Sequence, residues 1–154
     1  MILLAPIAAL AAGLAVARRR FVIVRIGGAS MLPTYRTGDR VLVRRTTGAG
    51  VRRGQVVVLQ TALPGGKWRT GPLPRPGAAM WFIKRAVAVP GDPVPEQVAG
   101  RVGAAPGDAV PAGRLVVLGD GPVSEDSRVW GYVPFDRVLG VVVRSLSPAD
   151  DSGS

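Results

Sequence analysis

Six short runs rich in β-branched and aromatic residues, separated by turns that contain glycine or proline, constrain how this chain can fold. Runs of this composition and length favour β-strands. Beyond the N-terminal stretch, no segment keeps the 3.6-residue periodicity of an amphipathic helix. The predicted strands are 20–26, 40–43, 55–59, 80–89, 114–118 and 138–146. We therefore expect a mainly β fold, and the length of 154 residues suits a single globular domain.

Two segments rich in proline and glycine interrupt the predicted strands. Residues 61–79 are expected to form an exposed, mobile loop. Residues 90–113 contain the near-repeat PGDPVP and PGDAVP, at 90–95 and 106–111, which predicts two similar turns. The polar tail, 147–154, is expected to be disordered.

The N-terminal stretch, residues 2–16, contains no charged residue and is followed by Arg18, Arg19 and Arg20. A membrane-spanning helix needs about 20 apolar residues, and the snorkelling side chain of Arg18 extends a stretch that is a few residues short. Residues 1–20 are therefore predicted to form a transmembrane anchor. Two alternatives are a cleaved signal peptide, with 15–17 as an Ala-x-Ala site, and a helix buried in the core.

The composition limits the chemistry that is available. The chain has no cysteine and no histidine, which excludes thiolate chemistry, the Ser-His-Asp triad and most zinc sites. A catalyst would have to use Ser, Lys, Asp, Glu or Tyr. The net charge of +10 favours anionic partners, either nucleic acid or membrane lipid, although an arginine-rich composition can also reflect a GC-rich genome.

Ser30 lies in the tight sequence GGASMLPTY, residues 27–35, and needs a base to become a nucleophile. The chain has only two lysines, Lys67 in the proline-rich loop and Lys84 in an apolar run. Strand alternation places Lys84 on one face with Phe82, and burial of that face would favour the neutral amine. Taken alone, Lys84 is better explained as a lysine on the solvent face of an edge strand.

Three motifs, in this order and over about residues 24–143, resemble those of the type I signal peptidases, which are membrane-bound serine proteases with a Ser/Lys dyad. The first, Ser-Met-x-Pro-Thr followed by Gly-Asp, is matched by Ser30, Met31, Pro33, Thr34, Gly38 and Asp39. The second is matched by Lys84, Arg85, Pro90, Gly91 and Asp92. The third is matched by Gly119, Asp120, Ser124, Asp126, Ser127, Arg128 and Gly131.

The resemblance implies a compact signal-peptidase-like catalytic domain, 21–146, behind an N-terminal hydrophobic helix, and a role for individual residues. Ser30 would be the nucleophile and Lys84 its general base, with neither metal nor cofactor. The supporting residues would be Gly28 at the oxyanion position, Ser124 orienting the lysine, and a buried ion pair of Asp126 and Arg128. The substrate-binding residues would be Ile26, Gly27, Met31, Pro33 and Phe82, of which Phe82 is also a candidate wall for the lysine. Substrates would be secreted pre-proteins or leader peptides, cut after small residues of Ala-x-Ala type.

The chain departs from the family in three respects. It has GDGP where many relatives have Gly-Asp-Asn, its third motif is one residue shorter than in the longer bacterial enzymes, and it has no room for their large second domain. The compact form suggests a protease devoted to one or a few substrates. The positive-inside rule places residues 18–20 and the following domain in the cytoplasm, whereas the family's catalytic domain faces outward. We favour the family's single-pass, extracytoplasmic arrangement, and a cytoplasmic-facing maturation protease is the alternative.

In two further hypotheses the chain is not a signal peptidase. One is a non-enzymatic basic β-domain that binds nucleic acid or anionic lipid. Its few, scattered aromatic residues offer no stacking platform, so nucleic acid is not an expected partner. The other is a self-cleaving relative of the repressor proteases, which would cut at Ala17.

Overall fold

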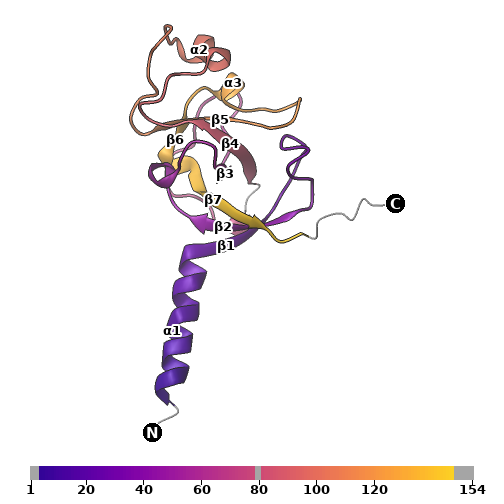
Figure 1. Ribbon diagram of the computed structural model, residues 1–154, viewed down its shortest axis with the longest axis vertical. Coiled ribbons are helices and arrows are strands. Elements are labelled where there is room, and N and C mark those ends of the chain that lie inside the picture. The colour runs from indigo at the N-terminus through magenta and orange to yellow at the C-terminus, as the bar shows by residue number, and fades with distance from the viewer. Residues whose placement is uncertain (1–3, 79–80, 148–154) are drawn as a thin grey trace, which may run out of the picture.

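The fold is built on one seven-stranded sheet in which every neighbouring pair runs antiparallel (Figure 1). The computed structural model describes residues 4–78 and 81–147. The strand order is β1-β2-β7-β3-β4-β5-β6. The strands are β1 Phe21–Arg25, β2 Arg40–Arg45, β3 Val56–Leu59, β4 Phe82–Ala88, β5 Arg114–Leu118, β6 Val133–Pro134 and β7 Val138–Ser145. The mainly β prediction is confirmed.

All six predicted strands are present, with ends that differ by up to two residues where the structure describes them. Met80, the first residue of the predicted strand 80–89, lies outside the described residues. The seventh strand, β6, was not predicted because two residues carry no alternation. Three short 3₁₀ turns complete the regular structure, η1 Gly48–Gly50, η2 Pro76–Ala78 and η3 Phe135–Arg137.

Two short helices differ from the sequence-based interpretation. One, α2 (Glu96–Val102), lies between the two predicted turns and ends at Gly103 in the left-handed conformation. The other, α3, spans Ser127–Trp130. Neither helix is long enough to display a helical period. The two similar turns are confirmed: the side chains of Asp92 and Asp108 each accept a hydrogen bond from the backbone N–H three residues earlier.

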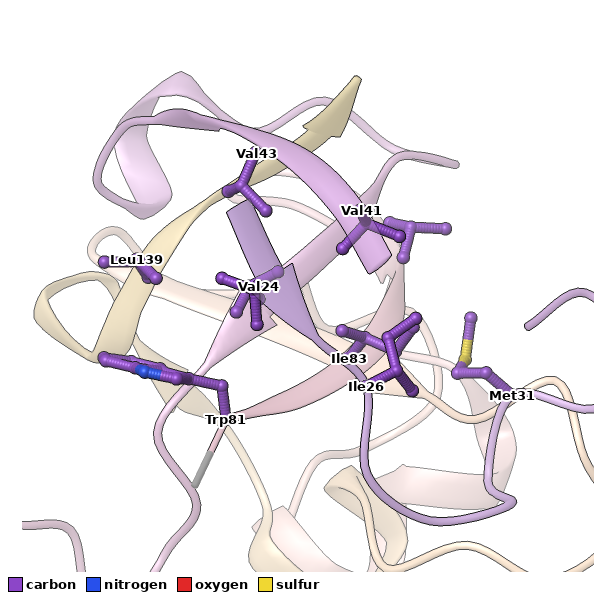
Figure 2. Packing of buried hydrophobic residues seen from close by; sticks show 10 residues of the cluster. Val24, Ile26, Met31, Val41, Val43, Trp81, Ile83 and Leu139 are labelled. Carbon is purple, nitrogen blue, oxygen red and sulfur yellow. The ribbon is translucent and has the colours of Figure 1, made fainter. Parts of the chain in front are cut away.

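Apolar side chains cover both faces of the sheet. One cluster includes Val24, Met31 and Ile83, and Figure 2 shows it where β1 and β2 approach the start of β4. A second cluster, on Val57, Ala86, Trp130 and their neighbours, fills the space under α3. Because β4 lies between β3 and β5, Lys84 stands on an interior strand and is only 1% exposed. The alternative of a solvent-facing lysine on an edge strand is therefore wrong.

The N-terminal helix, α1 (Leu4–Arg20), projects away from the sheet and runs directly into β1 (Figure 1). Residues 5–20 are exposed, so α1 is not the buried core helix of the alternative interpretation. Its last turn carries Arg18, Arg19 and Arg20, which complement the negative end of the helix dipole. Within residues 4–78 and 81–147, no helix combines the length and the apolar character needed to cross a bilayer.

The C-terminal end of the described chain is held by hydrogen bonds to Arg40. The backbone N–H of Leu146 donates to the Arg40 carbonyl at 2.7 Å. Ser147, the first residue of the predicted disordered tail, accepts a hydrogen bond of 2.8 Å from the backbone N–H of Arg40. The remainder of that tail, 148–154, lies outside the described residues.

Candidate active site

The turn that carries Ser30 follows directly from β1. The backbone of Ile26 closes the base of the loop by a pair of hydrogen bonds, donating to Asp39 and accepting from Gly38. Gly28 has a φ of 83°, a conformation that strongly favours glycine. Met31 is 1% exposed and packs into the cluster of Figure 2, so it fixes the turn against the core. Ser30 is thereby held at the end of the sheet beside β4.

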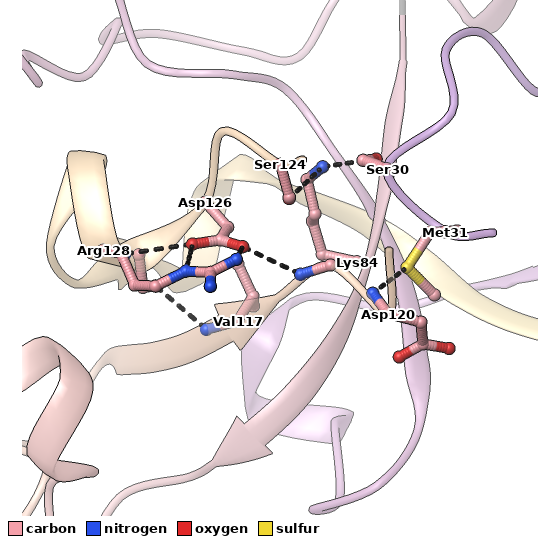
Figure 3. Close-up of polar contacts among 10 residues, drawn as sticks. Ser30, Met31, Lys84, Val117, Asp120, Ser124, Asp126 and Arg128 are labelled. Atoms are coloured by element: carbon pink, nitrogen blue, oxygen red, sulfur yellow. Dashed lines mark hydrogen bonds and ion pairs between the residues drawn. The ribbon is translucent and has the colours of Figure 1, made fainter. Parts of the chain in front are cut away.

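The amine of Lys84 lies between two serine hydroxyls (Figure 3). Lys84 Nζ donates a hydrogen bond of 2.6 Å to Ser30 Oγ and another of 3.1 Å to Ser124 Oγ. Ser30, Lys84 and Ser124 come from three different motifs of the sequence. The structure therefore brings together the predicted nucleophile, base and orienting residue.

The protonation of Lys84 is governed mainly by burial. Removal from water lowers the pKa of its amine to about 8. The nearby carboxylates of Asp126 and Glu125 oppose this shift of the pKa, and the Arg128 guanidinium adds to it. A lysine with this pKa exists partly as the neutral amine near neutral pH, which is what a general base requires.

The aromatic wall at the amine is Trp130, whose ring centroid is 5.9 Å from Lys84 Nζ. Sequence reasoning missed this residue and suggested Phe82, which is half-buried at the start of β4. Trp130 belongs to α3 and is buried in the second apolar cluster. The signal that could have pointed to it is its position inside the third motif, between Arg128 and Gly131.

Asp126 is a fully buried carboxylate that organises the third motif. It accepts hydrogen bonds from the backbone N–H of Gly119 at 2.9 Å and of Arg128 at 3.1 Å, and it also caps α3. Its two oxygens bind the guanidinium of Arg128 at 3.0 and 2.8 Å. Burial alone would raise the pKa of Asp126, but these hydrogen bonds lower it. The predicted pair is present, yet it is not fully buried, because the side chain of Arg128 is 41% exposed.

A second ion pair joins all three motifs, and sequence reasoning gave it no role. Arg85 binds Asp120 through two hydrogen bonds, of 2.8 and 2.6 Å. Asp120 also accepts one of 2.8 Å from the hydroxyl of Thr34, in the nucleophile turn. The hydrogen bond from Arg85 is the main cause that lowers the pKa of Asp120. The contact links the nucleophile turn, strand β4 and the loop after β5.

Two glycines allow the loop after β5 to approach the nucleophile turn. The N–H of Gly121 donates a 2.8 Å hydrogen bond to the carbonyl of Ser30. A Cβ on Gly119 would lie 2.5 Å from that carbonyl oxygen, and one on Gly121 would lie 2.9 Å from the carbonyl of Ala29. Side chains at these positions would force the backbones apart.

The residues predicted to bind substrate fall into three groups. Ile26 and Gly27 line a groove of about 360 Å³ between β1 and η2, together with Ile23, Val24, Arg25, Pro76, Gly77 and Trp81. Met31 faces the core, and Phe82 does not line this groove. Pro33 is exposed in the nucleophile turn and follows a cis peptide bond. Trp81 donates a 2.9 Å hydrogen bond to the carbonyl of Pro76 and so holds the far wall of the groove.

No group of three or more acidic, histidine or cysteine side chains that could hold a metal ion occurs within the described ranges.

Comparison with known proteins identifies the family. The family model described as "Signal peptidase, peptidase S26" matches residues 1–102 and 95–146. A protein named signal peptidase I from Leptolyngbya laminosa is 31% identical over 144 residues, which cover 80% of this chain and 68% of that protein. The chain belongs to the signal peptidase family S26. It is a serine protease, a hydrolase of peptide bonds, whose family cleaves signal peptides from secreted pre-proteins and is typically associated with membranes.

Proposed function

We propose that the chain removes signal or leader peptides by a dyad of Ser30 and Lys84. The observation that carries this proposal is the 2.6 Å separation between Lys84 Nζ and Ser30 Oγ, at an amine that is 1% exposed. A buried amine in contact with a hydroxyl can serve as its general base.

In this mechanism neutral Lys84 takes the proton of Ser30 Oγ as the oxygen attacks the scissile carbonyl. The resulting ammonium then gives its proton to the leaving amine, which leaves an acyl ester on Ser30. In the second half Lys84 takes a proton from water, the hydroxide oxygen attacks the ester, and the proton returns to Ser30 Oγ. Ser124 supports both halves because its hydroxyl holds the amine at 3.1 Å.

The oxyanion is proposed to bind the backbone N–H of Ser30. Gly28 stands where some relatives supply a hydroxyl, and it offers no side chain. Its φ of 83° would also strain a serine placed there. Stabilisation of the oxyanion in this chain would therefore rely on backbone donors.

The substrate is proposed to bind in the groove beside β1. This strand is the first in the sheet order, so its outer edge is open to an added strand within the described fold. The groove runs along Ile23–Gly27 towards the turn of Ser30. Its small volume, about 360 Å³, is consistent with the small residues that the family prefers before the cut.

Residues 1–20 are proposed to anchor the protein to membrane lipid, with residues 21–146 as the catalytic domain on the extracytoplasmic side. The support is the apolar character of α1, in which Ile7 and Leu10 are 62% and 75% exposed and have no apolar cover in the described fold. Arg18, Arg19 and Arg20 stand where lipid headgroups would lie.

Two alanine variants test the dyad. Ser30→Ala and Lys84→Ala should each abolish cleavage of a leader peptide with an Ala-x-Ala site, while circular dichroism shows a folded domain. Lys67→Ala is the matched control, since it removes the chain's other lysine from an exposed loop and should keep full activity. Full activity of either dyad variant would overturn the proposal.

A further inference from the structure

The loop between β3 and β4, residues 60–81, contains a second tryptophan that contacts the wall of the lysine site. Trp68 packs edge-on against Trp130, with ring centroids 5.9 Å apart and an interplanar angle of 79°. The ring of Trp130 in turn lies 5.9 Å from Lys84 Nζ. Two aromatic rings thus connect the surface loop with the buried amine.

The loop is fastened in this position at several points. Leu63 N–H donates to the Lys67 carbonyl at 2.7 Å, and Arg69 donates to the Thr61 carbonyl at 3.1 Å. The guanidinium of Arg137, which is 1% exposed, binds the carbonyl of Gly71 and, at 3.0 Å, the side chain of Gln60. The charge of Arg137 is paired with Asp136 at 3.2 Å. Loss of the loop contacts would leave buried N–H donors of Arg137 without these partners, so the contacts favour the observed position of the loop.

Solvent lies directly on the outer side of Trp68. Trp68 lines two open surface grooves of about 570 and 430 Å³, and Trp130 lines the second of them as well. On the other side of the loop, residues 62–66 and Trp130 enclose a smaller cavity of about 200 Å³. Trp68 therefore covers the part of Trp130 that it contacts, while another part of Trp130 borders the second groove.

We propose that Trp68 is a positioning residue for the reaction: by packing against Trp130, it holds that ring over Lys84 and keeps water away from the amine. The inference rests on the proposed Ser30/Lys84 dyad. The charged groups that act on the amine are Asp126, Glu125 and Arg128, all at or near α3. A substitution at Trp68 removes none of these charges. A change in the titration of Lys84 would therefore report on the access of water to the amine and on the position of the Trp130 ring.

The test compares three variants of the full chain, Trp68→Ala, Trp68→Phe and Lys67→Ala. The first readout is a side-chain NMR titration of isotope-labelled lysine, which needs no enzymatic activity. The chain has only two lysines, so Lys67→Ala assigns the two signals and serves as the matched loop control. The second readout is the pH profile of kcat/KM on a leader peptide.

In Trp68→Ala we expect the pKa of Lys84 to rise by about half a unit to one unit, because water reaches the amine more easily. Activity should fall about 3- to 10-fold at pH 7 and recover to nearly the wild-type rate at pH 10, since only the protonation equilibrium has moved. Trp68→Phe should stay close to wild type in both the Lys84 titration and the pH profile of kcat/KM, because its aromatic ring can still pack against Trp130.

An unchanged Lys84 titration in Trp68→Ala would overturn the inference, as would an equal loss of activity at every pH, which a merely structural role predicts. If Trp68→Ala does not fold, Trp68→Leu takes its place and the same titrations decide. Failure of the dyad is recognised separately, by cleavage in Ser30→Ala. The lysine titration still tests the contact in that case.

Discussion

The amine of Lys84 is the single group whose protonation should set the pH dependence of cleavage. With a pKa of about 8, only about one tenth of the molecules carry the neutral base at pH 7. We therefore expect kcat/KM on a leader peptide to rise about tenfold between pH 7 and pH 9, with half of the rise complete near pH 8. A profile that is flat across this range would contradict Lys84 as the base.

Burial of Lys84 should also cost the protein stability, with a definite pH dependence. The pKa is lowered in the folded state, from 10.5 to about 8, so unfolding takes up a proton between these values. The resulting reduction in the free energy of unfolding is complete below pH 8, becomes smaller as the pH rises and is absent above about pH 10.5. Lys84→Met should thus raise the free energy of unfolding at pH 7 by about 1 to 3 kcal/mol, after allowance for the lost hydrogen bonds.

Urea unfolding at pH 7 and pH 10 measures this effect. The advantage of Lys84→Met over wild type should shrink at the higher pH. Lys67→Met, which changes an exposed lysine, should show no such trend. A Lys84→Met variant that is less stable than wild type at pH 7 would show that the hydrogen bonds to Ser30 and Ser124 outweigh the desolvation of the amine.

At the scale of elements, the close approach between the loop after β5 and the nucleophile turn depends on Gly119. A methyl group there would lie 2.3 Å from Ser124 Oγ and 2.5 Å from the Ser30 carbonyl oxygen, so Gly119→Ala must displace the side chain of Ser124 and the turn relative to the loop. We expect a loss of activity of about 100-fold or more, and a loss of stability of about 2 kcal/mol. Enzyme assays and urea unfolding measure the two effects.

Gly100 is the matched control for this substitution. It lies in α2, and a Cβ there would meet no atom within 4 Å. Gly100→Ala should leave activity unchanged and stabilise the helix by up to about 1 kcal/mol. If Gly119→Ala kept wild-type activity, the contact between the two segments would not be needed to hold Ser30 in place.

The ion pair of Arg85 and Asp120 also acts between elements, because it ties β4 to the loop after β5 and, through Thr34, to the nucleophile turn. Asp120→Asn removes the charge and keeps the shape. We expect a loss of about 1 to 2 kcal/mol in stability and a lower kcat, with the acidic limb of the pH profile still near pH 8. A shift of that limb would mean that Asp120 acts on the base itself.

The elements also show how far the sequence could predict the structure. The strands could be predicted because each is a run of β-branched residues between turn signals, whereas β6 and the two short helices are too brief to show a period. The pairing order is not a local property. The sequence could not decide whether Lys84 lies on an edge strand or an interior one, and the answer depends on β5, which is distant in sequence.

The candidate site divides in the same way. Ser30, Lys84, Ser124 and Asp126 could be predicted from motif resemblance, and the structure brings their side chains together. The contact of Trp68 with Trp130 could not, because a contact between a loop before β4 and a helix after β5 leaves no pattern in the sequence. Ile26 and Met31 were predicted at the substrate site from the family resemblance, but Met31 faces the core.

For the whole molecule, the separation of α1 from the sheet allows the anchor and the protease to be tested apart. The helix projects from the domain, and residues 5–20 are exposed, so its removal uncovers little of the apolar core (Figure 1). We expect the fragment 21–154 to fold and to cleave a short leader peptide at close to the rate of the full chain. It should lose binding to lipid vesicles, because the exposed apolar side chains of α1 are absent.

Vesicle sedimentation separates the contribution of the apolar side chains of α1 from that of its arginines. The measurement compares the full chain, the fragment and a variant in which Arg18, Arg19 and Arg20 are changed to Gln. The Gln variant should still bind neutral vesicles, but its preference for anionic vesicles should weaken by about 1 kcal/mol for each arginine at the surface. If the fragment bound vesicles as well as the full chain, the sheet domain itself would be the lipid-binding part. In that case the proposed anchor would be wrong, while the Ser30/Lys84 chemistry would still stand on its own geometry.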